Sequence, residues 1–236
     1  MTSIRTGMAL AAGLGTRMQP LTLTRPKALV EVGDRPLLDH VLDRFAMSGI
    51  KRAVVNVHHF ADQMRAHLAA RKGAPEIAIS DESDAVLETG GGLVKARGLL
   101  GKTPVVVSNI DAIWTESGVP QLDRLIAAFD SEQMDALLLL APAGNTLGYG
   151  GAGDFFLDAD GRVRRRGEAA TAPFVYSGTQ ILNPRILDAY REERFSLNRI
   201  WNDLLVRGRV SGQVMEAFWM HVGDPDARDA AERKLG

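Results

Sequence analysis

Short apolar runs alternate with helical patterns along the first 140 residues of the chain. Runs rich in Val, Ile, Leu and Ala predict buried strands at residues 8–12, 53–57, 76–80, 104–108 and 136–140. Between them, apolar residues recur at helical spacing and predict helices at residues 35–48, 61–70, 93–100 and 119–129. Strands and helices that take turns in this way favour a mostly parallel sheet with helices on both faces. This part of the chain is therefore predicted to have an α/β fold.

The alternation gives way at Gly144 to a less regular pattern. Five glycines among residues 144–153 indicate a loop, and the turn sequence at 158–161 predicts a hairpin. Further strands are expected at residues 173–182 and 210–218, and further helices at 187–192, 197–206 and 225–234. The chain shows no internal repeat, low-complexity tract or linker, so residues 1–236 are expected to form one domain.

The first predicted strand runs directly into a loop that is suited to anions. Gly13 and Gly15 carry no side chain, so backbone N–H groups there can approach phosphate oxygens closely. Arg17 offers a planar fork of hydrogen-bond donors, and Lys27 adds a point charge. Residues 109–111 follow another predicted strand and should face the same crevice, because ligands bind at the carboxyl ends of parallel strands. The sequence therefore predicts a phosphate-binding site at this edge of the sheet.

Two well-known phosphate-binding motifs do not fit this stretch. A dinucleotide fingerprint requires a third glycine where Met18 stands, and Pro20 would break the helix that should begin there. A P-loop requires a glycine directly before its lysine, whereas Pro26 precedes Lys27. A plain tight turn explains the glycines but not the residues that follow them.

Residues 10–29 resemble the signature of the sugar-nucleotide pyrophosphorylases, the nucleotidyltransferases that join a nucleoside triphosphate to a sugar 1-phosphate. The family pattern Leu-Ala-Ala-Gly-x-Gly-Thr-Arg-Met-x-Pro-Leu-Thr, followed by Pro-Lys-x-Leu, is matched throughout. The resemblance implies a Rossmann-like, GT-A-like mixed sheet, with a nucleotide-binding part over about residues 1–143 and a smaller sugar-binding lobe over about 144–236. It implies nucleotide contacts from Leu10, Ala11, Ala12, Gly13, Gly15, Thr16, Arg17, Lys27, Glu88, Thr89, Gly90 and Gly91.

Nucleotidyl transfer brings two polyanions together, so the catalyst must neutralise charge and align the reactants. The resemblance accordingly gives catalytic roles to Arg17, Lys27 and Asp111. Asp111 follows a predicted strand and matches the aspartate that holds Mg²⁺, the implied cofactor, although Ile110 replaces the glycine of the family's Asn-Gly-Asp. A turn-forming aspartate that binds nothing is the alternative.

The second metal carboxylate of the family precedes Val-Gly-Thr near the C-terminus. His221 occupies that position here, and Asp224 stands in place of the threonine. Imidazole is a poor ligand for Mg²⁺, so either Asp224 is the second ligand, His221 binds through water, or Asp111 holds the ion alone. Asp224 is equally suited to cap the helix predicted at 225–234.

Three glycines at 90–92 predict a loop before the helix at 93–100, and in relatives this loop lies along the nucleobase. A plain helix start is the alternative. The resemblance places the sugar among Glu88, Asn109, Gly150, Glu168, Ser177 and Gly178. Many relatives carry a lysine directly after the glutamate, which contacts the sugar phosphate, and Ala169 stands at that position here. The three arginines at 164–166 either substitute for it or form a solvated face.

Composition restricts the partners and the compartment. The net charge of −1 gives no reason to expect nucleic acid or an anionic membrane as a partner. The chain has no cysteine, which excludes thiol catalysis and fits a reducing cytoplasm. It shows neither an apolar leader before the first strand nor a run long enough to cross a bilayer. Small-molecule substrates and a cytoplasmic location are expected, while the oligomeric state cannot be predicted.

Several further features resemble one branch of the family, the N-acetylmuramate-1-phosphate uridylyltransferases. They are the motif at 88–92, residues 195–198 followed by Trp201, and the sequence Trp-x-His-Val-Gly at 219–223. The resemblance implies UTP and N-acetylmuramate 1-phosphate as substrates and a role in cell-wall recycling. Mannose-1-phosphate guanylyltransferases share the loop and much of the size. A non-catalytic regulatory protein that binds nucleotide sugars is the alternative from another class.

Overall fold

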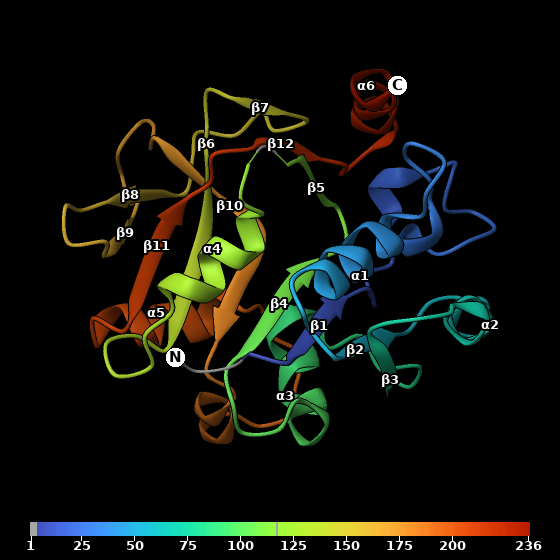
Figure 1. Ribbon diagram of the computed structural model, residues 1–236, viewed down its shortest axis with the longest axis horizontal. Coiled ribbons are helices and arrows are strands. Elements are labelled where there is room, and N and C mark those ends of the chain that lie inside the picture. The colour runs from blue at the N-terminus through green and yellow to red at the C-terminus, as the bar shows by residue number, and fades with distance from the viewer. Residues whose placement is uncertain (1–3, 117) are drawn as a thin grey trace.

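The computed structural model describes residues 4–116 and 118–236. Within these residues nine strands form a central sheet in the order β11-β6-β10-β4-β1-β2-β3, with β8 paired to β10 and β9 to β8 (Figure 1). The strands are β1 (Thr6–Leu10), β2 (Arg52–Val57), β3 (Glu76–Asp81), β4 (Val105–Asn109), β6 (Ala136–Pro142), β8 (Phe155–Leu157), β9 (Val163–Arg165), β10 (Phe174–Leu182) and β11 (Val210–Val214). Strands β1 to β4 are parallel, and β10 runs antiparallel between β4 and β6. The mixed sheet confirms the predicted α/β fold.

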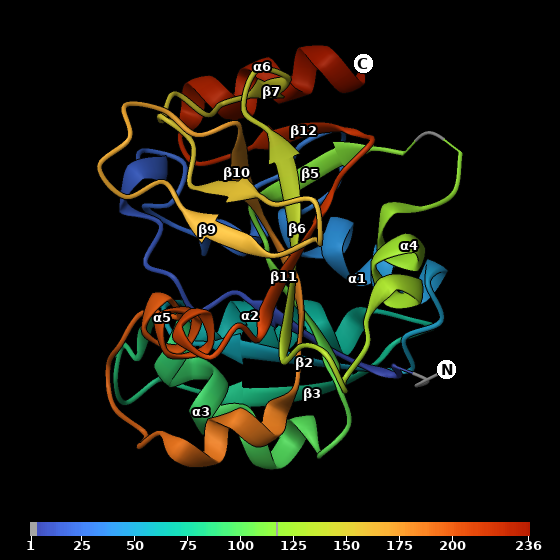
Figure 2. The same cartoon turned by 90° about the vertical axis from the view of Figure 1, so that its left-hand side faces the viewer.

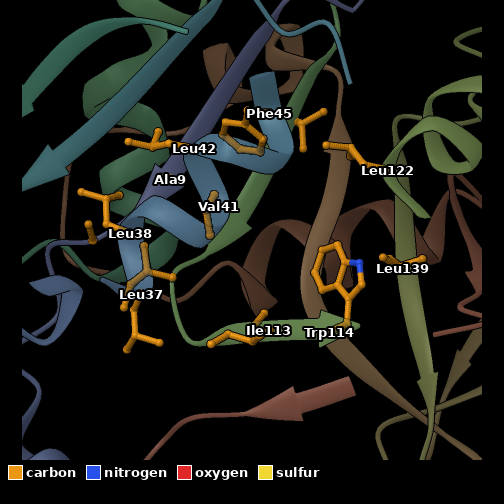
Figure 3. Close-up of a cluster of buried hydrophobic side chains, with 14 of the residues drawn as sticks. Ala9, Leu37, Leu38, Val41, Leu42, Phe45, Ile113, Trp114, Leu122 and Leu139 are labelled. Carbon is orange, nitrogen blue, oxygen red and sulfur yellow. The ribbon is translucent and has the colours of Figure 1, made fainter. Parts of the chain in front are cut away.

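Helices cover both faces of the central sheet (Figures 1 and 2). They are α1 (Leu37–Met47), α2 (Ala61–Ala70), α3 (Glu88–Leu100), α4 (Gln121–Ala128), α5 (Asn198–Val206) and α6 (Pro225–Leu235). Side chains alternate along β1, so Ala9 packs in the cluster that contains α1 and α4, whereas Met8 and Leu10 pack in the cluster that contains α3 and α5. Figure 3 shows the first cluster, with Phe45 of α1 lying over the sheet. Burial on both faces explains why these strands appear in the sequence as continuous apolar runs.

A small second sheet was not predicted. Among the described residues it has three strands, β5 (Ala112–Thr115), β12 (Phe218–His221) and β7 (Thr146–Leu147). It lies with α6 at one end of the molecule (Figure 2). The single strand predicted at 210–218 is wrong, because the chain leaves the central sheet after β11 and pairs with β5 as β12. The backbone N–H of Val222 donates to the carbonyl of Asp111 at 2.9 Å. The residues that follow β12 therefore lie next to those that follow β4.

The loop predicted before residue 93 is also wrong, because α3 begins at Glu88 and contains all three glycines. A Cβ at Gly90 would collide with the ring of Phe195, and one at Gly91 would collide with the carbonyl of Glu193. The glycines therefore serve the close approach of α3 to residues 193–195.

The helix predicted at 187–192 lies earlier in the chain and has a different form. Pro184–Ala189 form a 3₁₀ helix, which begins where the side chain of Asn183 accepts a hydrogen bond from the backbone of Arg185 at 3.3 Å. Among the helices of the described residues, none has the length and apolar character needed to span a membrane.

Candidate active site

A cavity of about 380 Å³ opens at the carboxyl ends of β1 and β4. Residues 10–17, Lys27 and residues 109–111 line it together. The predicted crevice shared by the glycine loop and the end of β4 is therefore confirmed. Glu88 and Thr89 line the same cavity, whereas Gly90 and Gly91 are not among its lining residues.

Gly15 and Met18 anchor the glycine loop to the rest of the protein, whereas Arg17 is exposed. Gly15 has a φ of 66°, and its carbonyl accepts a hydrogen bond from the hydroxyl of Thr22 at 2.8 Å. A short 3₁₀ helix, Thr16–Met18, follows and buries the Met18 side chain completely. Arg17 beside it is exposed and has no hydrogen-bond or ion-pair partner among residues 4–116 and 118–236. The loop thus presents a guanidinium that is free to bind an anion in the cavity.

Lys27, Asp111 and His221 lie close together where two cavities meet: Lys27 and Asp111 line this cavity, and Asp111 and His221 line a smaller one of about 160 Å³. The 3₁₀ helix Lys27–Leu29 places Nζ of Lys27 2.6 Å from Oδ2 of Asp111, and Nε2 of His221 lies 3.5 Å from the same oxygen. The Lys27 and Asp111 side chains are only 11% and 18% exposed. Burial by itself raises the pKa of Asp111, but the nearby His221 ring and the charge of Lys27 outweigh it and hold that pKa well below its usual range. Asp111 is therefore an ionised carboxylate at neutral pH.

The structure gives Asp224 the capping role that its sequence position allowed. Its Oδ1 accepts a hydrogen bond from the backbone N–H of Ala227 at 2.8 Å, at the start of α6. Asp224 is not among the residues that line the cavity. Within the described part of the chain, no group of three His, Cys, Asp or Glu side chains is placed to hold a metal ion. Asp111 nevertheless suits Mg²⁺, because this ion is commonly bound by one or two carboxylates together with substrate phosphates.

The sequence analysis did not predict two buried polar side chains, Asn56 and Glu82, which are hydrogen-bonded to each other and to the start of the glycine loop. Asn56 accepts a hydrogen bond from the backbone N–H of Ala11 at 2.6 Å and donates to Oε1 of Glu82 at 2.8 Å. Both side chains line the cavity, and Glu82 is 1% exposed. Burial raises the pKa of Glu82, and the hydrogen bond from Asn56 opposes that effect. Both residues could have been found from the sequence, because Asn56 lies near the end of one predicted strand and Glu82 lies just after the end of the next.

The predicted nucleotide contacts at the start of α3 already have partners within the protein. The backbone N–H groups of Gly90 and Gly91 both donate to the carbonyl of Phe195, at 3.0 and 3.2 Å. They are therefore engaged in the fold. Glu88 has a φ of 59° and forms an ion pair with Arg194 at 2.9 Å, near the rim of the cavity. Positive φ at a non-glycine residue is a strained conformation that is often found at binding sites.

Two smaller cavities adjoin the first one. Asn109 lines all three, and the cavity of about 160 Å³ is lined also by Ser177 and Gly178, whose contacts to a sugar stay a prediction. Gly150 and Glu168 are exposed and line none of these cavities. Asp154 was missed, although it lines the two smaller cavities together with Tyr176.

The Nucleotidyl transferase family matches residues 6–235 of the chain. N-acetylmuramate alpha-1-phosphate uridylyltransferase of Caulobacter vibrioides is 51% identical over 231 residues, which cover 97% of this chain and 96% of that protein. The protein of the same name from Neisseria meningitidis serogroup B is 32% identical over 225 residues, 92% of each chain. A solved structure of UDP-glucose pyrophosphorylase complexed with UDP-glucose has a TM-score of 0.80 at 15% identity and covers 98% of both chains. This last likeness concerns the fold, which is the expected GT-A-like one.

Proposed function

Because the chain belongs to the nucleotidyl transferase family, we propose that it transfers the uridylyl group of UTP to N-acetylmuramate 1-phosphate, with release of pyrophosphate. One observation carries the proposal: Arg17, Lys27 and Asp111 line a single cavity in a chain that is 51% identical to an N-acetylmuramate alpha-1-phosphate uridylyltransferase. The product would be the UDP-sugar, and a role in cell-wall recycling follows from that product. UTP is a cytoplasmic metabolite, so we propose the same compartment for the enzyme.

In the proposed reaction an oxygen of the sugar phosphate attacks the α-phosphorus of UTP. The bond from that phosphorus to the bridging oxygen breaks, and pyrophosphate leaves with the electron pair. Arg17 and the backbone N–H groups of the glycine loop bind the β- and γ-phosphates and stabilise the charge that develops on the leaving group. Lys27, which pairs with Asp111, is proposed to bind the same phosphates. These groups accelerate transfer through alignment and charge and need no covalent intermediate.

Mg²⁺ is the proposed cofactor, and Asp111 is its proposed protein ligand. The ion would supply additional positive charge to the phosphates. We propose Asp111 as the single carboxylate ligand of Mg²⁺, because the other two candidates do not suit the ion. Asp224 caps α6, and the imidazole of His221 is a poor ligand for Mg²⁺.

Substrate contacts are proposed for both parts of the domain. The proposed nucleotide contacts, from the loop 10–17, Lys27, Glu88 and Thr89, all lie before about residue 143. The proposed sugar contacts come mainly from the residues after 143, with Glu88 and Asn109 contributed by the first part. Four proposed sugar contacts line cavities, namely Glu88, Asn109, Ser177 and Gly178, and Gly150 and Glu168 are retained as contacts made from the exposed loops around them.

A substrate matrix tests the proposal. Purified protein is incubated with Mg²⁺ and each of four nucleoside triphosphates, against the 1-phosphates of N-acetylmuramate, N-acetylglucosamine, mannose and glucose. Pyrophosphate release should be fastest with UTP and N-acetylmuramate 1-phosphate. Preference for GTP and mannose 1-phosphate would identify a mannose-1-phosphate guanylyltransferase instead. Binding of UDP-sugars without turnover of any pair would identify a regulatory protein.

A further inference from the structure

The three arginines at 164–166 do three different things in the structure. Arg164 is 63% exposed and pairs with Asp158 at 3.3 Å. Arg166 is part of the fold, because its guanidinium donates to the carbonyl oxygens of Gly153 at 3.0 Å and Ala169 at 2.7 Å. Arg165, at the end of β9, is half-buried and lines the cavity of about 300 Å³. Of the three arginines, Arg165 is therefore the one that lines a cavity next to Asn109 in the described part of the chain.

Arg165 is held in place by aromatic rings and by hydrogen bonds to neutral groups, and the charge that acts on it is the carboxylate of Asp154, which is not within ion-pair distance among the described residues. Its guanidinium lies over the rings of Phe155 and Trp201, at 5.1 and 5.5 Å from their centroids. One nitrogen, Nη2, donates to Oδ1 of Asn202 at 2.9 Å and to the carbonyl of Asn198 at 3.5 Å. Within the part of the chain that the structure describes, Arg165 has no ion-pair partner, and its Nε and Nη1 have no acceptor. A guanidinium held at one nitrogen leaves a donor edge open to a planar anion.

The cavity of Arg165 continues from the proposed reaction centre. Thr89 and Asn109 line both this cavity and the larger one, so a sugar bound next to Asn109 extends toward Arg165. The first residues of α5 also line the cavity, and the positive end of that helix favours an anion there. Asp154 lines it too, but its Oδ2 accepts a hydrogen bond from the backbone of Tyr176 at 3.0 Å. A carboxylate such as Asp154 suits the hydroxyl or amide groups of a sugar.

Arg17 and Lys27, which line the larger cavity, account for the phosphates of the triphosphate. Arg165 lines the adjoining cavity, so its anionic partner belongs to the sugar substrate: either the 1-phosphate, which all these sugars share, or a further anionic group on the sugar. N-acetylmuramate differs from N-acetylglucosamine by a lactyl ether on C3, and this ether ends in a carboxylate. We propose that Arg165 binds the lactyl carboxylate and thereby selects N-acetylmuramate 1-phosphate over N-acetylglucosamine 1-phosphate. This inference rests on the proposed function, and it identifies Arg165 as the residue that determines the specificity for the sugar.

The test compares the two sugars in the wild type and in three variants, with UTP and Mg²⁺. Arg165→Gln should raise the KM for N-acetylmuramate 1-phosphate about 10- to 100-fold, the range for hydrogen bonds to a charged group. Arg165→Lys should recover part of this loss, because lysine keeps the charge but not the planar fork. Arg164→Gln is the matched control, since that neighbouring guanidinium points to solvent and pairs with Asp158. It should keep the wild-type KM.

N-acetylglucosamine 1-phosphate, measured as a substrate or as a competitive inhibitor, should bind equally well to the wild type and to Arg165→Gln. The KM for UTP should also be unchanged, which excludes a general disturbance of the fold. An equal loss on both sugars would overturn the inference, as would an unchanged KM for N-acetylmuramate 1-phosphate in Arg165→Gln. Failure of the proposed function is a separate result, because the wild type itself would then not use N-acetylmuramate 1-phosphate.

Discussion

Replacing Lys27 by methionine separates the two roles that the structure gives to this residue, in stability and in catalysis. The side chains of Lys27 and Asp111 are 11% and 18% exposed, and their charged atoms are 2.6 Å apart. Removal of one partner from a fully buried pair costs about 3–5 kcal/mol. Both side chains keep some exposure to solvent, and His221 stays 3.5 Å from the carboxylate, so we expect a smaller loss in the free energy of unfolding. We expect Lys27→Met to lower the free energy of unfolding by about 2 kcal/mol at pH 7.

The loss should depend on pH. The pKa of Asp111 is lowered in the folded protein, so its ion pair contributes stability above the unfolded pKa, and this contribution disappears as the pH falls through the folded pKa. The difference between wild type and Lys27→Met should therefore be complete above about pH 5 and shrink below about pH 4. Urea unfolding at several pH values measures it.

Asp111→Asn provides the matched background for this experiment. Without the carboxylate, loss of Lys27 leaves no unpaired charge, so the same Lys27→Met change should cost less than about 1 kcal/mol. An equal cost in both backgrounds would refute the argument from charge pairing. Turnover is a separate readout, and loss of one positive charge at the reacting phosphates should lower kcat about 10²- to 10³-fold.

Four other outcomes are expected. Arg17→Ala should lower kcat about 10²-fold and leave urea unfolding unchanged, because the side chain is exposed and unpaired among the described residues. Asp111→Asn should reduce Mg²⁺-dependent turnover more than His221→Ala does, and the reverse order would show that the metal is elsewhere. Asp224→Ala should cost about 1 kcal/mol of stability with little effect on turnover, whereas a large kinetic loss would make it a metal ligand. Gly91→Ala should destabilise the fold, which thermal unfolding would show, because its Cβ would collide with Glu193.

The regular part of the fold was predictable because its signals are local. Strands such as β2, which is buried on both faces, appear as apolar runs, and α2 was predicted with the same bounds that the structure gives it. The glycine loop and Asp111 both follow such strands, and this position at the carboxyl end predicted their shared cavity.

The errors concern contacts between distant parts of the chain. Three successive glycines normally indicate a loop, but in α3 they accommodate Phe195 and Glu193, about a hundred residues later. β12 was missed because its main partner is β5, another short strand far away in sequence. The roles of neighbours 164–166 could not be separated from the sequence either, because the inward direction of Arg165 depends on the packing of Phe155 and Trp201.

The central claim is that the glycine loop, Arg17, Lys27 and Asp111 together bind the triphosphate. A crystal structure with a non-hydrolysable UTP analogue and Mg²⁺ tests it most directly. The account predicts phosphate oxygens within hydrogen-bond distance of Arg17 and Lys27, with the metal ion bound to Asp111. A triphosphate bound in another cavity, or oriented with its phosphates away from these three side chains, would contradict it.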